Sequence, residues 1–137
     1  MDNPFLLPLP MLAFYAVINA LLMLVLGMLV VRARVKTKTE IGDGGHPGMI
    51  GPLRAHANNA EYVPMAIILL MILYALGANV YVIHAVGGTL TLGRLLHGIG
   101  LTRNVGTSAP RFLGMVLTWL SYIIAIVATL WLTFAPG

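Results

Sequence analysis

The sequence has no cysteine and very little charge. Without cysteine the chain can form no disulfide, and it offers no thiol of its own as a nucleophile or metal ligand. Only 9% of its residues are charged, and its mean hydropathy is +0.93. Soluble domains carry about 25% charged residues. The composition therefore excludes an ordinary soluble domain, and any thiol chemistry would have to arrive with a substrate.

In place of charge the chain has long apolar runs. They predict helices over residues 10–31, 54–76, 81–101 and 111–134. Each run is close to the roughly 20 residues that a membrane crossing needs. No small-residue cleavage site follows the first run, so a retained helix is expected there and not a signal peptide. Residues 1–137 are therefore predicted to form one all-α domain, an integral membrane four-helix bundle.

The first connection, residues 32–53, is basic and rich in helix breakers. Glycine and proline are concentrated between Gly42 and Pro52, which predicts an irregular, mobile connector. The pattern GxxxxGK[ST] is absent and no strand precedes the segment, so a phosphate-binding loop is not indicated.

Positive charge is confined to a few places along the chain. The lysines and arginines are Arg32, Arg34, Lys36, Lys38, Arg54, Arg94, Arg103 and Arg111. With four crossings all of them fall at one membrane face, which the positive-inside rule makes cytoplasmic. The first and third connections are then cytoplasmic, and both termini face the opposite side. Because no basic surface with aromatic platforms accompanies this charge, no nucleic-acid partner is expected.

The start of the second predicted helix, LRAHANNAEYVPM, is unusually polar for a membrane segment. Arg54, Asn58 and Glu61 fall within about 60° of one another on a helical wheel, and Tyr62 flanks them. The third helix presents Arg94 and His97, one turn apart, at the same membrane face. Ionisable groups in a bilayer usually pair, which predicts an ion pair of Glu61 with Arg94 or Arg54.

This face has more cations than anions, because Glu61 is the acid of the membrane segments. The arginines that approach the face are Arg32, Arg34, Arg54, Arg94 and Arg111. Guanidinium groups suit carboxylates, and Glu61 could take an ammonium. The set matches a small zwitterionic peptide with two carboxylates and an amine, such as glutathione. The alternative is a structural network that only holds the second and third helices together.

Two segments carry a family resemblance. RAHANNAEYVP, with Arg54, Asn58, Glu61 and Pro64 as its most specific positions, and GRLLHGIGL, with Arg94 and His97, resemble the MAPEG family of glutathione-dependent membrane enzymes. That family includes microsomal glutathione transferases and membrane synthases of eicosanoid metabolism. The short cysteine-free chain and the DGGHP loop resemble its bacterial branch, which implies a bacterial inner membrane.

The resemblance implies a homotrimer that binds glutathione between subunits near the cytoplasmic face. The residues it places around the peptide are Arg32, Arg34, Arg54, Asn58, Glu61, Tyr62, Arg94 and His97. It matches Arg111, with Arg103 as substitute, to the arginine that stabilises the glutathione thiolate. The implied reaction is attack of that thiolate on a lipophilic second substrate from the bilayer, or peroxide reduction. Leu101 replaces a tyrosine of the eicosanoid-type members, which argues against lipid-synthase activity.

Two other classes stay open at this point. His56 and His97 lie near one membrane face on adjacent helices, as a bis-histidine haem or a metal would need, but neighbouring arginines disfavour a bound cation and no metal is expected. A non-enzymatic carrier or assembly protein with a structural Arg/Glu/His network is the second. It would move or hold a partner without consuming thiol.

Small and polar residues within the apolar runs predict helix packing. Asn19 is expected to form an interhelical hydrogen bond in the membrane. The fourth helix carries a seam of small residues spaced alternately by four and three, namely Gly114, Thr118, Ser121, Ala125 and Ala128. The seam predicts close approach of another helix, from the same subunit or from a second one.

Overall fold

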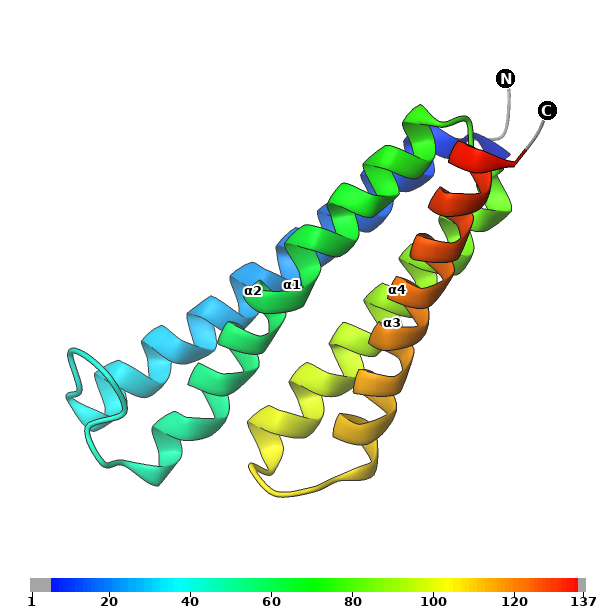
Figure 1. Cartoon of the computed structure of the whole chain (residues 1–137). Coiled ribbons are helices and arrows are strands. Elements are labelled where there is room, and N and C mark those ends of the chain that lie inside the picture. The colour runs from blue at the N-terminus through cyan, green and yellow to red at the C-terminus, as the bar shows by residue number, and fades with distance from the viewer. Residues whose placement is uncertain (1–5, 136–137) are drawn as a thin grey trace.

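A computed structural model describes residues 6–135. Over this range the chain forms α1 (Pro8–Thr37), α2 (Pro47–Ala75), α3 (Val80–Arg103) and α4 (Ala109–Phe134), with no strand. The helices run alternately up and down as an elongated bundle (Figure 1). The predicted all-α, four-helix architecture is confirmed. Figure 1 also shows that the α1–α2 pair and the α3–α4 pair separate toward one end.

The connection between α1 and α2 is shorter than the predicted segment 32–53 and covers residues 38–46. α1 continues through its basic residues because arginine and lysine are good helix formers. It ends where Lys38 adopts a left-handed conformation (φ 54°) and the Thr39 amide donates to the Arg34 carbonyl at 3.1 Å. α2 begins at Pro47, since a proline in the first turn loses no helical hydrogen bond.

Three helices, α1, α2 and α4, are long and apolar enough to cross a membrane. The chain is therefore a membrane protein. α3 was expected to be a fourth crossing, but its composition is less apolar because polar residues and glycines occupy its buried face. Its outer face is apolar, with Leu92, Leu95 and Ile99 exposed, and it lies alongside α4 along the bundle (Figure 1).

α3 and α4 touch through their backbones. A Cβ atom at Gly114 would lie 2.5 Å from the His97 amide nitrogen, and one at Gly93 would lie 2.8 Å from the Gly114 carbonyl oxygen. Gly114, Thr118, Ser121 and Ala125 are buried, while Ala128 is half-buried. The predicted seam of small residues is confirmed, and its partner is α3 of the same chain.

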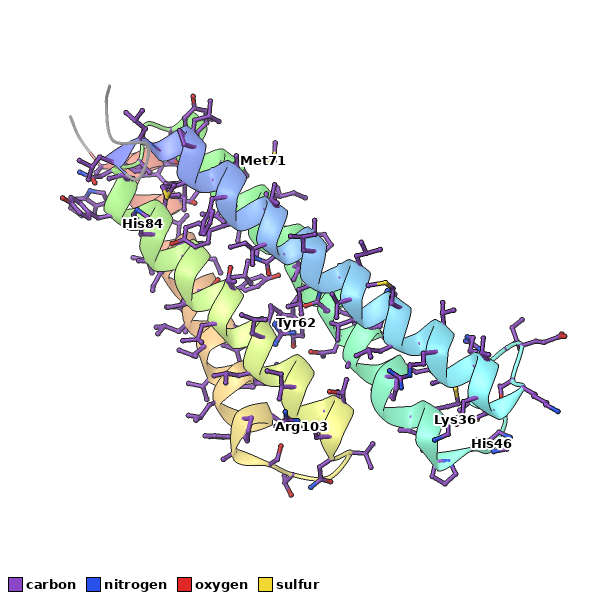
Figure 2. All side chains as sticks on the ribbon, turned by 180° about the vertical axis from the view of Figure 1, so that it is seen from behind. Lys36, His46, Tyr62, Met71, His84 and Arg103 are labelled. Carbon is purple, nitrogen blue, oxygen red and sulfur yellow. The ribbon has the colours of Figure 1, made fainter. Side chains whose placement is uncertain are left out.

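The two ends of the bundle differ in character. The turn end, where the α2–α3 turn (residues 76–79) lies, holds an apolar core from all four helices that includes Met11, Leu70, Ile83 and Ala125. The loop end, where residues 38–46 and 104–108 lie, has a smaller cluster of Leu26, Ala55 and Leu101. Figure 2 shows His84 at the turn end and Lys36 and Arg103 at the loop end.

Two polar contacts join α1 to α3 in the turn-end half. The Tyr15 hydroxyl lies 2.8 Å from His84 Nδ1, and the Tyr15 ring fills space that a side chain at Gly87 would occupy. Asn19 Nδ2 donates to Thr91 Oγ1 at 2.8 Å. This contact joins α1 to α3, which confirms the predicted interhelical hydrogen bond.

Candidate functional site

The candidate site is built around Arg94, whose side chain is 1% exposed. Its Nε donates to Thr118 Oγ1 at 2.9 Å, and its Nη1 donates to Asn58 Oδ1 at 2.8 Å. The guanidinium carbon lies 5.2 Å from the centre of the Tyr62 ring. One side chain of α3 thus joins α2 to α4, and all these partners are neutral. Figure 2 shows Tyr62 within the bundle, between the two ends.

The partners of Arg94 are themselves held in place. The Thr118 hydroxyl donates to the Gly114 carbonyl at 2.7 Å, which leaves its oxygen free to accept from Arg94. The Tyr122 hydroxyl donates to the Tyr62 carbonyl at 2.6 Å, and the two rings meet edge to face. The neutral cage around the cation is therefore set by α2 and α4 together.

Glu61 does not form the predicted ion pair with Arg94 or Arg54. Within residues 6–135 no acidic side chain pairs with Arg94. Asn58 occupies the position facing α3 instead, and its Nδ2 donates to Glu61 Oε2 at 3.3 Å. The Glu61 carboxylate is connected to Arg94 through the Asn58 amide. Because Glu61 lies on the exposed edge of α2, its carboxylate remains open to solvent or ligand.

His97 lies one turn beyond Arg94 and is 4% exposed. Its backbone lies against Gly114 of α4, so it belongs to the same α3–α4 contact as Arg94. Leu101, one further turn along, packs with Leu26 and Ala55. The position of the missing tyrosine is thus filled by apolar packing.

Arg111 begins a second feature, a groove of about 300 Å³ along α4. Its guanidinium donates through Nη1 to the carbonyls of Val105 and Gly106, at 2.9 and 3.1 Å. The lining is Thr107, Ser108, Arg111, Phe112, Met115, Val116 and Trp119. Met115 also contacts the buried cation, since its Sδ lies 3.4 Å from Arg94 Nη2. One methionine side chain therefore separates the polar cluster from the apolar groove.

The other predicted arginines are not drawn into this cluster. Arg34 is committed to its own loop, where Nη1 donates to the carbonyls of Thr39, Glu40 and Gly42. Arg54 is exposed near the start of α2, and Arg32 is exposed on α1 beside a different groove. The structure brings together Asn58, Tyr62, Arg94 and, through Asn58, Glu61, with His97 adjacent.

The two histidines considered for haem or metal lie at different helix contacts. A Cβ atom at Gly27 of α1 would lie 3.6 Å from His56 Nε2, so His56 faces α1. His97 lies against α4. Within the described residues no group of three metal-ligating side chains is present.

Comparison with known proteins decides the family. The family model described as MAPEG family matches residues 12–131. The chain belongs to the MAPEG family. It is 35% identical over 119 residues to the inner membrane protein YecN of Escherichia coli strain K12, covering 87% of this chain and 89% of that protein. The YecN protein of Escherichia coli O6:H1 strain CFT073 gives the same figures. No solved structure matches significantly.

Three contributors to the site of this MAPEG protein were missed by sequence reasoning. The sequence pattern predicts a packing role for Thr118 and no role for Met115 or Tyr122, but the structure places all three at the Arg94 cluster. All three lie on α4, three or four residues apart, on the side that meets α2 and α3. Their spacing on one helical face was a usable signal.

Proposed function

We propose that this MAPEG protein binds glutathione near the loop end and activates its thiolate against lipophilic electrophiles or peroxides. The observation that carries the proposal is the buried Arg94 cation, which has neutral partners alone within the described chain. A buried charge is costly unless it is paired. A carboxylate of the ligand would supply the missing counter-ion.

The remaining features of the cluster suit the rest of the peptide. Glu61, exposed and held by Asn58, suits the ammonium of glutathione. The Asn58 amide and the Tyr62 hydroxyl add neutral hydrogen-bonding groups. Arg32, Arg34 and Arg54 stay predictions of the family resemblance. In a homotrimer, which that resemblance implies, the exposed Arg54 would be available to a peptide that lies between subunits, whereas Arg34 Nη1 already donates to the carbonyls of its own loop.

The groove beside Arg111 suits the chemical step. Two donors of Arg111 hold the loop, and since a guanidinium has five N–H groups, others remain for a thiolate. A nearby cation favours the thiolate, which is the nucleophile. Phe112, Val116 and Trp119 offer an apolar approach for a second substrate from the bilayer.

The proposed reactions balance without a redox cofactor. In the transferase reaction the sulfur forms a bond to an electrophilic carbon, and the leaving group departs with the electron pair of its bond. In the peroxidase reaction a hydroperoxide oxidises two glutathione molecules to the disulfide and is reduced to an alcohol and water.

The charge distribution supports the proposed orientation. Lys36, Lys38 and Arg103 lie at the loop end, which the positive-inside rule places in the cytoplasm. Glutathione would then enter from the cytoplasmic side. The E. coli relatives are named inner membrane proteins, and we assign this chain to the same kind of membrane.

Equilibrium binding tests the proposal directly. Reduced glutathione and S-hexyl glutathione are titrated into detergent-purified protein and followed by calorimetry. We expect saturable binding of both, with the S-hexyl compound at least as tight because the Arg111 groove can take its alkyl chain. Absence of binding up to millimolar glutathione, in protein shown to be folded, would overturn the proposal and leave the Arg94 network as a structural link between three helices.

A further inference from the structure

The last turns of α1 carry basic side chains that the fold divides between two faces. Arg34 is bound to the carbonyls of its own loop. Arg32 and Lys36 are four residues apart and so share another face of the helix. Both are exposed, and neither forms a hydrogen bond or ion pair with the described part of the chain. Their charges are therefore available to a partner.

These two cations border a groove of about 240 Å³ where α1, α2 and α3 meet. Leu29 and Ala33 line it from α1, Pro52 from α2 and Thr102 from α3. Leu29 packs on the buried Leu26–Ala55–Leu101 cluster, which makes one side of the groove apolar and fixed. The groove thus combines an apolar interior with a cationic border.

The groove lies at the depth of lipid headgroups. Apart from Asn19, α1 is apolar from Pro8 to Val31, which corresponds to roughly 36 Å at about 1.5 Å per residue. The hydrocarbon core of a bilayer is about 30 Å thick. Arg32 and Lys36 come directly after this apolar length, and Figure 2 shows Lys36 at the loop end, beyond the middle of the bundle.

We propose that this groove binds an anionic membrane phospholipid. Its phosphate would lie between Arg32 and Lys36, and its glycerol and upper acyl chain would contact Leu29 and Ala33. Basic residues beside membrane helices attract anionic headgroups, and a cationic border over an apolar interior matches a molecule that is charged at one end. This assignment separates Arg32 from the peptide site, and it does not depend on glutathione binding.

Native mass spectrometry of detergent-purified protein tests the site. The protein is titrated with phosphatidylglycerol and, in parallel, with phosphatidylcholine of the same acyl chains. We expect phosphatidylglycerol to bind preferentially, and its affinity to fall roughly ten-fold in the Arg32→Gln/Lys36→Gln double variant. The phosphatidylglycerol affinity of each single variant should lie between those of the wild type and the double variant. Arg32→Lys, which keeps the charge, should retain most of the binding.

Lys38→Asn is the matched control, because Lys38 is basic, exposed and at the same end but does not line the groove. Asparagine also tolerates the positive φ of this position. An equal loss of lipid in Lys38→Asn and in Lys36→Gln would reduce the effect to general charge and overturn the site. So would unchanged binding in the folded double variant, or displacement of the lipid by millimolar glutathione.

Discussion

The two ends of the bundle treat their polar groups in opposite ways. At the turn end Tyr15 lies against His84, and Asn19 donates to Thr91, so polar side chains of α1 and α3 are matched to each other. Between the two ends Arg94 is buried with neutral partners, and at the loop end Arg32 and Lys36 are exposed without a hydrogen-bond partner in the described residues. The apolar core of the turn end is also the larger one.

This difference between the ends indicates which part of the bundle supports stability and which part is suited to binding. The turn-end contacts involve neutral groups, and Tyr15, His84, Asn19 and Thr91 each have a hydrogen-bond partner within the bundle. Arg94, Arg32 and Lys36 have no anionic partner in the described residues, so an anionic ligand would be bound favourably there. The contact of α3 with α4 connects the two ends of the bundle. Gly114 of α4 lies against His97 of α3, the helix that also carries Arg94. Variants can therefore test the ends separately.

The largest effect is expected at the α3–α4 contact. Gly114→Ala places a Cβ atom 2.5 Å from a backbone nitrogen, which cannot move without shifting α3. We expect a loss of about 3 kcal/mol of unfolding free energy, at the upper end for overpacking. Denaturant unfolding in detergent measures it. Gly48→Ala is the control, since nothing lies near Gly48, and it should be neutral or slightly stabilising. Equal stability of the two variants would refute the backbone contact.

The next largest effect is expected on the rate of conjugation and not on glutathione affinity. Arg111→Ala should lower the rate of conjugation roughly 100-fold, because a preorganised charge beside the thiolate is lost. Glutathione affinity should change little. Activity with a chromogenic electrophile and calorimetry measure the two quantities. Wild-type activity in Arg111→Ala would show that Arg111 does not stabilise the thiolate. If Arg103→Ala lost activity while Arg111→Ala did not, the role would be assigned to Arg103.

Arg94→Met separates binding from folding. It removes the buried cation but keeps an unbranched apolar side chain, so thermal stability should stay within a few degrees. Glutathione affinity should fall at least ten-fold, since an ion-paired carboxylate contributes roughly 1.5–3 kcal/mol. The glutathione affinity of Arg94→Lys should lie between those of the wild type and Arg94→Met. If Arg94→Met fails to fold, the network is structural and the proposed counter-ion role is lost.

Glu61→Gln should have a smaller effect. The glutamine oxygen can still accept from Asn58, so stability should be unchanged. The lost attraction for an ammonium at an exposed position should weaken glutathione binding several-fold, corresponding to about 1 kcal/mol. Equal affinities would assign Glu61 to orienting Asn58 alone.

The smallest effect is expected at the turn end. Asn19→Leu removes the hydrogen bond to Thr91, and bonds of this kind in membrane proteins average about 0.6 kcal/mol. Unfolding should change by about that amount, with glutathione binding untouched. A large loss of binding would show that the two ends are coupled.

The number of helices and most of their limits could be predicted from the sequence because apolar runs and helix signals are local. The pairing of Arg94 could not. Periodicity places Asn58 and Glu61 on one face of α2, but which of them faces α3 depends on the rotation of packed helices. The family resemblance places Arg34 near the ligand, whereas its hydrogen bonds to the loop carbonyls depend on how the loop folds back, which the sequence alone does not show.

The connection between α1 and α2 shows a different limit. Its glycines and prolines predict irregular backbone, yet Pro47 and Pro52 lie within α2. The first needs no helical partner for its nitrogen, and the second costs the helix one hydrogen bond. Gly51 adds a packing reason, since a Cβ atom there would lie 3.0 Å from the Leu101 carbonyl.

The glycine contact between α3 and α4 has a mechanical consequence. With backbone against backbone at Gly93, Gly100 and Gly114, no flexible side chain is available to absorb a displacement. Rotation or sliding of α4 would drive its larger residues into α3, so the two helices must move as one rigid unit. Tilting this unit away from the α1–α2 pair would have to break the hydrogen bonds that Arg94 and Tyr122 make to Asn58 and Tyr62 of α2.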